Sequence, residues 1–268
     1  MTVSAFILGL ACLSAALSVI MAIAWLVWRA SRNSGWVDTI WTFGLGFVGL
    51  AGAVTTRPMD FQGALVAAMA AIWSLRLGLH IASRTRGITD DPRYARLVWD
   101  WGADATRQMF WLLQKQAIVS IPLALSMWLA ANGSAPPVQT VTAILIFGVA
   151  VVGEGIADEQ LRRFRHDPAN KGKICDVGLW RVSRHPNYFF EWLGWLAYPV
   201  LAIDLGEHDL WGWFALLAPL CMYWLLVHVS GVPPLEEHML ADRGDAFRRY
   251  QMKTNVFFPG PPKTSAGG

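Results

Sequence analysis

The polar residues best suited to chemistry lie between two apolar runs in the second half of the chain. They are Arg184, His185, Pro186, Asn187, Tyr188 and, four positions after Asn187, Glu191. Pro186 suits the first turn of a helix, because its missing N–H would have no intrahelical partner there. The free N–H groups and the dipole of a helix N-terminus favour an anion. Asn187 and Glu191 share one helix face, so we expect an anionic, hydrogen-bonding ligand here.

A second polar stripe ends an earlier apolar run. Glu154, Asp158, Arg162 and Arg165 follow one another at spacings of four, four and three residues. This spacing places them on one face of a helix. They form either ion pairs on a solvated surface or the lining of a cofactor pocket, and both alternatives stay open at this point.

Ionisable residues also lie in or beside the apolar runs of the first half, at Asp38, Arg76 and His80. Such groups are functional candidates, because burying them in hydrocarbon costs several kcal/mol. The alternative for Arg76 is snorkelling from a helix end. Asp38 is flanked by indoles, a setting that favours the protonated acid through desolvation.

Seven apolar runs must position these residues. The chain is 54% hydrophobic and 15% charged, whereas a soluble domain carries about a quarter charged residues. We therefore predict an all-α, multi-pass integral membrane protein of about seven transmembrane helices. The runs are Ala5–Trp28, Thr39–Val54, Ala64–Ile81, Ala117–Ala131, Val138–Ala157, Tyr188–Ile203 and Trp211–Val229.

The distribution of positive charge fixes the expected orientation. Apart from Arg57 and Arg76, every Lys and Arg lies after run 1, between runs 3 and 4, between runs 5 and 6, or after run 7. The connection between runs 6 and 7 is acidic, with Asp204, Glu207 and Asp209. This alternation predicts an odd number of spans and a cytoplasmic C-terminus, in the inner membrane if the source is bacterial. One domain over residues 1–258 and a disordered tail at 259–268 complete the predicted organisation.

The combined motifs of the second half resemble the steroid 5α-reductase family, most closely its bacterial membrane branch (DUF1295-like). The resemblance is strongest from Gly153 to Pro259. It rests on the run Arg184 to Tyr188 with Glu191, on the pair Glu236 and Glu237, and on the segment Arg243 to Pro259 with Tyr250. Isoprenylcysteine and phospholipid methyltransferases share the Arg-His-Pro-x-Tyr motif with a different cofactor.

The resemblance implies an NADPH-dependent reduction of a carbon–carbon double bond conjugated to a ketone, as in a 3-oxo-Δ4-steroid or a similar lipophilic enone. Family members hold the substrate carbonyl with a Glu near the second span and a Tyr in the third. Asp38 falls near the first of these positions, but the third run has no Tyr, which leaves Asp38 or His80 as the expected donor. The implied cofactor residues are Arg76, Glu154, Asp158, Arg162, Arg165, Arg184, His185, Asn187, Tyr188, Glu191, Glu236, Glu237 and Tyr250.

The expected partners are a lipophilic small molecule and membrane lipids, with no nucleic acid, no metal and a monomeric chain. Two other functions stay open. One is an S-adenosylmethionine-dependent membrane methyltransferase, which would use the shared motif and the Glu236–Glu237 pair. The other is a transporter or lipid-binding protein. A transporter would be expected to carry polar sites at the membrane midplane, whereas here they gather near one face.

Overall fold

The computed structural model describes residues 1–55, 60–87, 90–206 and 209–261, and it divides into two compact units. Unit 1 comprises Met1–Gln139 and Tyr198–Ala218, and unit 2 comprises Thr140–Ala197 and Pro219–Gly268. The single domain over residues 1–258 stays a prediction. Arg57, Glu207 and positions 262–268 of the predicted tail lie outside the described residues.

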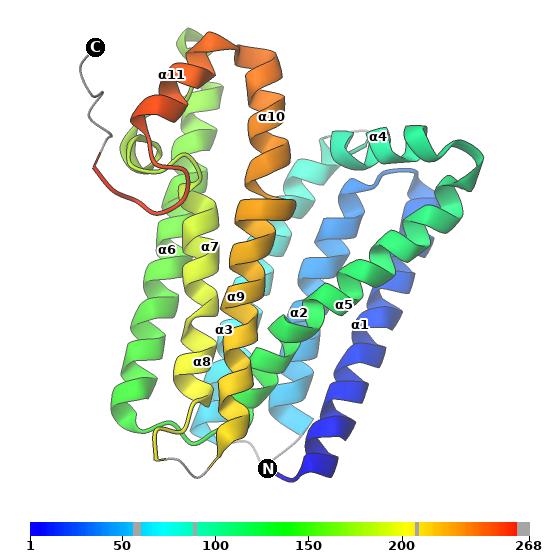
Figure 1. Cartoon of the computed structure of the whole chain (residues 1–268), viewed down its shortest axis with the longest axis vertical. Coiled ribbons are helices and arrows are strands. Elements are labelled where there is room, and N and C mark those ends of the chain that lie inside the picture. The colour runs from blue at the N-terminus through cyan, green and yellow to red at the C-terminus, as the bar shows by residue number, and fades with distance from the viewer. Residues whose placement is uncertain (56–59, 88–89, 207–208, 262–268) are drawn as a thin grey trace. The chain divides into compact units, whose positions relative to one another are not determined.

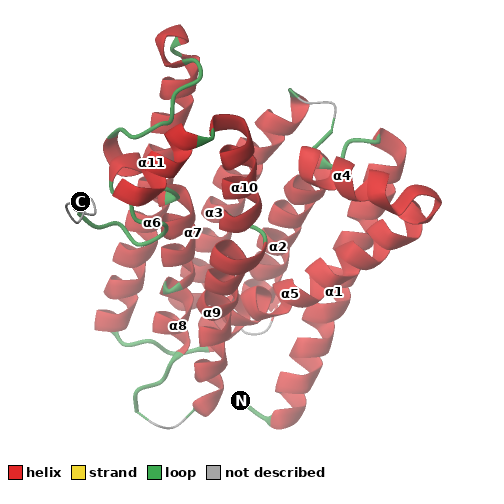
Figure 2. Cartoon of the chain, turned by 45° about the horizontal axis from the view of Figure 1, so that its top comes forward, coloured by secondary structure: helices red, strands yellow, loops and turns green. Residues whose placement is uncertain are grey.

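Helices make up all the regular structure in the described residues (Figure 2), which confirms the all-α prediction. In Figure 1, α1, α2 and α5 of unit 1 lie side by side, and α4 lies across one end of them. The elements of unit 1 are α1 (Val3–Ser31), α2 (Gly35–Thr55), α3 (Phe61–Arg86), α4 (Pro92–Trp101), the 3-10 turn η1 (Gly102–Asp104), α5 (Ala105–Asn132), most of α8 (Ala197–Ala202) and η4 (Leu210–Leu216).

Small residues let the helices of unit 1 approach closely. A Cβ atom added to Gly46 of α2 would lie 2.2 Å from the Ser74 side chain of α3. One added to Gly78 of α3 would lie 2.6 Å from the ring of Phe43. Interfaces between membrane helices are rich in such small residues, because packing rather than the hydrophobic effect holds the helices together in lipid.

Unit 2 is built around the α6–α7 pair, which lies side by side in Figure 1. A Cβ atom added to Gly153 of α6 would lie 2.4 Å from the ring of Phe190 on α7, so the two backbones are close. The elements of unit 2 are most of α6 (Pro137–His166), η2 (Pro168–Asn170), η3 (Gly178–Arg181), α7 (Pro186–Trp195), most of α9 (Leu217–Trp224), the π-helix η5 (Leu225–Val229), α10 (Val232–Arg243) and α11 (Asp245–Lys253).

Within the described ranges, six helical stretches are long and apolar enough to cross a membrane. They are Val3–Ser31, Gly35–Thr55, Phe61–Arg86, Arg93–Asn132, Pro137–His166 and Leu210–Arg243. The remaining predicted span, Tyr188–Ile203, falls on α7 and α8, which Leu196 separates into two shorter helices. Many large apolar side chains on the six stretches are exposed, as lipid-facing side chains would be. The protein is thus a multi-pass membrane protein, as predicted.

Candidate functional site

The two polar stretches that the sequence places on α6 and α7 meet in unit 2. The side-chain amide of Asn187 donates a hydrogen bond to Oδ1 of Asp158 over 3.3 Å. Glu154 and Glu191 are both buried, and Glu191 accepts a hydrogen bond of 2.9 Å from the indole N–H of Trp195. Residues 29 positions apart in sequence therefore form one polar face, with carboxylates and an amide as its chemical groups.

The two arginines of the α6 stripe are exposed at the end of that helix. The guanidinium of Arg162 pairs with Glu159, with Nε 2.6 Å from Oε2. Arg162 thus pairs with Glu159, the residue after Asp158, whereas Asp158 itself contacts Asn187. Exposed ion pairs of this kind contribute little stability, so a bound phosphate could replace Glu159 as the partner of Arg162.

Three other predicted cofactor residues bind one another: Arg184, His185 and Glu236. Together with Gln251, which was not predicted, they form what we call the Glu236 clamp. Arg184 Nε donates to Oε1 of Glu236 over 2.7 Å, and His185 Nε2 lies 2.9 Å from the same oxygen. Gln251 donates to Oε2 of Glu236 over 2.7 Å. The ring of Tyr188 stacks on His185, with centroids 5.4 Å apart. Glu237 is exposed, so Glu236 is the engaged member of the acidic pair.

The clamp ties the C-terminal segment to the loop before α7. Arg184 Nη1 donates to the carbonyls of Gln251 and Thr254, and its backbone N–H donates to the carbonyl of Asn255. The Tyr250 hydroxyl donates to the carbonyl of Trp180 over 2.5 Å. Burial raises the pKa of Tyr250 well above its ordinary value. Tyr250 therefore holds α11 against this loop, and a direct contact with a cofactor stays a prediction.

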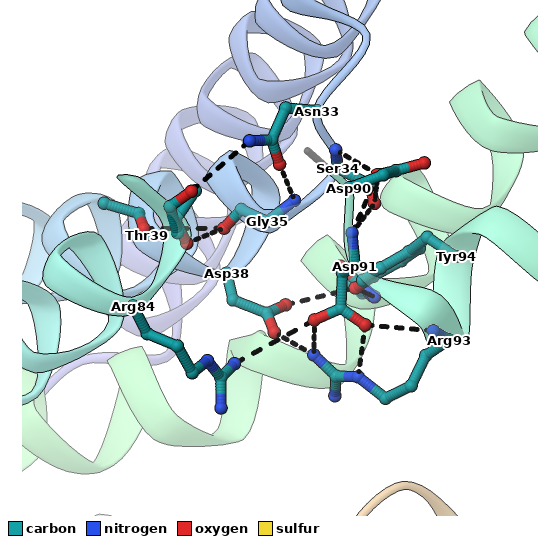
Figure 3. Close-up of polar contacts among 12 residues, drawn as sticks. Asn33, Ser34, Gly35, Asp38, Thr39, Arg84, Asp90, Asp91, Arg93 and Tyr94 are labelled. Atoms are coloured by element: carbon teal, nitrogen blue, oxygen red, sulfur yellow. Dashed lines mark hydrogen bonds and ion pairs between the residues drawn. The ribbon is translucent and has the colours of Figure 1, made fainter. Parts of the chain in front are cut away.

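A different polar network lies in unit 1, at the start of α2 and α4 (Figure 3). Asp91 caps α4 by accepting from the backbone N–H of Arg93, and its carboxylate also accepts from Arg93 Nε at 3.0 Å and Nη2 at 2.9 Å. Burial pushes the pKa of Asp91 upward, but hydrogen bonds and charge from Arg93, with help from Arg84, hold it below its usual value. Asp91 therefore fixes the position of the Arg93 guanidinium.

Arg93 in turn contacts Asp38. Nη2 of Arg93 lies 2.6 Å from Oδ2 of Asp38, and the hydroxyl of Tyr94 donates to Oδ1 over 3.1 Å (Figure 3). Gln116 of α5 donates to the Tyr94 hydroxyl over 2.9 Å. A guanidinium at this distance pairs with a carboxylate, so Asp38 accepts hydrogen bonds here. The part that Asp38 plays in catalysis stays a prediction.

Two loops hold this network in place. The backbone N–H of Ser34 donates to Asp90 over 2.8 Å, and the Ser34 hydroxyl also contacts that carboxylate. The side chain of Asn33 accepts from the N–H of Gly35 at 2.9 Å (Figure 3). It also donates to the carbonyl of Thr85 at 3.4 Å. The connection before α2 is thereby tied to the one before α4, which sets α4 against α2.

The other unit 1 candidates lie on α3. Arg76 is partly buried and His80 is exposed. In the described part of the chain no hydrogen bond or ion pair joins His80 to Asp38, and both stay predicted as alternative donors. Arg93 and Tyr94 contact Asp38 but are not among the predicted site residues. The resemblance places the tyrosine in the third span instead. The sequence did carry a signal, since Asp91 followed by Pro92 is a typical helix start.

Fold and sites together define the class as an all-helical, multi-pass membrane protein with polar networks near the basic ends of its helices. The chain belongs to the DUF1295 family, because the model of that family, described as "Protein of unknown function (DUF1295)", matches residues 24–254.

Two curated proteins are similar to parts of the chain. One is "Uncharacterized protein C594.04c" of Schizosaccharomyces pombe, 33% identical over 99 residues, which is 36% of this chain and 27% of that protein. The other is "Probable O-methyltransferase ustE" of Ustilaginoidea virens, 40% identical over 58 residues, which is 21% of this chain and 20% of that protein. The chain thus matches about a quarter of the length of these relatives. No solved structure matches it.

Proposed function

We propose that this protein is a membrane reductase that uses NADPH to reduce the carbon–carbon double bond of an α,β-unsaturated ketone, such as a 3-oxo-Δ4-steroid or a similar lipophilic enone. Its motifs resemble those of steroid 5α-reductases, and the DUF1295 family is related to such proteins. The observation that carries the proposal is the contact of Asn187 with Asp158. It joins the two motifs that the resemblance assigns to the nicotinamide cofactor.

The chemical groups of this face suit a dinucleotide. The carboxylates of Glu154, Asp158 and Glu191 can accept hydrogen bonds from ribose hydroxyls, and Asn187 can both donate and accept. Exposed Arg162 and Arg165 at the end of α6 can pair with phosphates. When bound, NADPH supplies the hydride, and the protein's task is to hold the cofactor and to exclude water.

The proposed reaction also needs a hydrogen-bond donor for the substrate carbonyl. Negative charge develops on the carbonyl oxygen of an enone during reduction, and a donor placed there lowers the barrier. The hydroxyl of Tyr94, held by Asp38 and Gln116, is a candidate donor. A substrate carbonyl would take the place of Asp38 as its acceptor, while Arg93 continues to pair with the Asp38 carboxylate.

Ligand-induced thermal stabilisation tests the cofactor directly, since a ligand that binds only the folded protein raises its melting temperature. The purified protein is heated with NADPH, NADH or S-adenosylmethionine at equal concentrations. We expect NADPH to give the largest rise, and a lipophilic enone added with NADPH to be reduced, as followed by the loss of NADPH absorbance. Stabilisation by S-adenosylmethionine alone, without enone reduction, would overturn the proposal.

A membrane methyltransferase is the second candidate, because one similar protein carries the printed name of a probable O-methyltransferase. Carboxylates such as Glu154 and Glu191 could equally hold the ribose of S-adenosylmethionine. The exposed arginines distinguish the two functions, because S-adenosylmethionine carries no phosphate. Arg162→Ala together with Arg165→Ala should weaken NADPH binding and leave S-adenosylmethionine binding unchanged.

A further inference from the structure

Unit 1 contains an apolar cavity of about 610 Å³ that none of the functions above uses. It lies between the first half of α1, the last turns of α2 and α5, and η4. Leu8, Leu13, Phe47, Val48 and Trp128 supply much of its wall. The cavity lies at the N-terminal end of α1, an end that Figure 1 marks with N. Arg29 lies in the last turn of α1, at the opposite end of that helix.

Small residues create this space. The lining residues of α1, which include Gly9, Cys12 and Ala16, recur every three or four positions and so occupy one helix face. Trp128 fits closely against Gly9, where an added Cβ atom would lie 2.5 Å from the indole. Gly52 of α2 borders the same ring, at 3.3 Å from an added Cβ atom. The wall around Trp128 is therefore tightly packed, and the open volume lies beside it.

The cavity is continuous with the lipid-facing surface. Leu8 of α1 and Phe47 of α2, both in its lining, are 66% and 65% exposed. Polar lining residues stand at the helix ends, with Thr55 closing α2 and Asn132 closing α5. Trp211 of η4 is also in the lining, and Trp is typical of the membrane–water interface. The space thus has an apolar body and a polar rim at one membrane surface.

We propose that this cavity binds one acyl chain of a phospholipid from the leaflet that faces away from the basic helix ends. The body of the cavity is lined by apolar side chains, and the medium against Leu8 and Phe47 is hydrocarbon. The volume falls within the range of about 300–1,000 Å³ that is usual for ligand sites. The polar rim suits the glycerol and headgroup of the same lipid. This site is independent of the proposed reductase activity, and neither proposal rests on the other.

Native mass spectrometry of the purified full chain tests the site. The variants Ala16→Phe and Ala51→Phe place a ring in the cavity, because both alanines line it. Ala15→Phe is the matched control, since Ala15 is exposed on α1 and is not among the lining residues. We expect wild type and Ala15→Phe to retain a phospholipid that survives detergent washing, and the two cavity variants to lose it. Equal phospholipid retention in all four proteins would overturn the proposal, as would a retained molecule of another class.

A second measurement needs no bulky substitution. Cys12 lines the cavity and carries an exposed free thiol. In delipidated protein, added phospholipid should slow alkylation of Cys12 by an apolar thiol reagent several-fold. The control is Cys12→Ala combined with Ala15→Cys, which presents the same thiol three positions further along α1, outside the lining. Its alkylation rate should not change. An equal effect of phospholipid at both positions would show ordinary micelle shielding and would contradict a defined site.

Discussion

The two units each contain an arginine and a carboxylate close to a buried tyrosine hydroxyl, and the arginine–carboxylate pairs differ in exposure. In the Glu236 clamp of unit 2, the side chains of Arg184 and Glu236 are only 9% and 12% exposed. In the network of unit 1, those of Arg93 and Asp38 are 47% and 24% exposed. The charged pair is thus enclosed in unit 2 and partly open in unit 1, whereas Tyr250 and Tyr94 are buried in both units.

This difference separates residues that hold the structure together from residues that can meet a ligand. In the clamp, the remaining donors of Arg184 bind backbone carbonyls, and the Tyr250 hydroxyl does the same. A ligand would have to displace all of these bonds. Around Asp38, the hydroxyl of Tyr94 binds only side chains, which can turn toward a substrate at smaller cost. We therefore expect mutations in the clamp to affect stability, and mutations in the unit 1 network to affect turnover.

The largest expected effect is that of Glu236→Ala. It leaves the buried guanidinium of Arg184 without its partner, and breaking a buried ion pair costs about 3–5 kcal/mol. The melting temperature of the detergent-purified protein should fall strongly. Glu237→Ala is the matched control, because its side chain is exposed, and it should leave the melting temperature unchanged. Equal effects of the two substitutions would show that the clamp does not stabilise unit 2.

Tyr94→Phe should have the next largest effect, on enone reduction. It removes only the hydroxyl, and losing one hydrogen-bond donor to a developing oxyanion lowers kcat about 10²-fold or more. NADPH binding should not change. His80→Ala, which alters the exposed residue on α3, should leave turnover unchanged. Turnover lost in His80→Ala but kept in Tyr94→Phe would assign the donor to His80 instead.

Asp38→Asn belongs to the same comparison. It keeps the shape of the side chain but removes the charge that Arg93 and Tyr94 bind. We expect kcat to fall while NADPH binding is kept. Wild-type turnover in Asp38→Asn would show that Tyr94 does not depend on this carboxylate.

A smaller effect is expected for Asn187→Ala, on cofactor binding. Its amide contributes hydrogen bonds of about 0.5–1.5 kcal/mol, so NADPH should bind up to about tenfold more weakly. The dissociation constant can be measured by titration with NADPH. Asn255→Ala removes the same group elsewhere in unit 2, where the amide donates to the Pro261 carbonyl, and should bind NADPH normally. An unchanged dissociation constant in Asn187→Ala would remove this residue from the cofactor site.

The smallest effect concerns acid stability and Asp91. Its pKa is lowered in the folded protein, so the stabilisation is present above the unfolded pKa, about 3.9, and is lost as the pH falls through the folded value. Below about pH 4 the wild-type melting temperature should therefore drop by a few degrees, about 2–4 °C per kcal/mol in a chain of this size. Asp91→Asn should show less of this drop, and an identical acid profile would exclude a role for Asp91.

The sequence alone determined the helical membrane class, the approximate spans and the polar stretches on α6 and α7. Long apolar runs and the side preference of Lys and Arg are one-dimensional signals, because the bilayer imposes length and polarity on each helix separately. The four-residue spacing from Asn187 to Glu191 likewise follows from helix geometry. That Asn187 meets Asp158 could be proposed only through the resemblance, since it depends on how two helices pack.

Only the tertiary structure decided what each polar residue contacts. Sequence could not show that Arg184, His185 and Glu236 bind one another, because they come from a loop and from α10, about fifty residues apart. It also could not place Tyr94 and Arg93 against Asp38, which required the turn before α4 to fold back onto α2. A side chain's chemistry depends on its neighbours, and neighbours brought together by packing leave no mark in the local pattern of the chain.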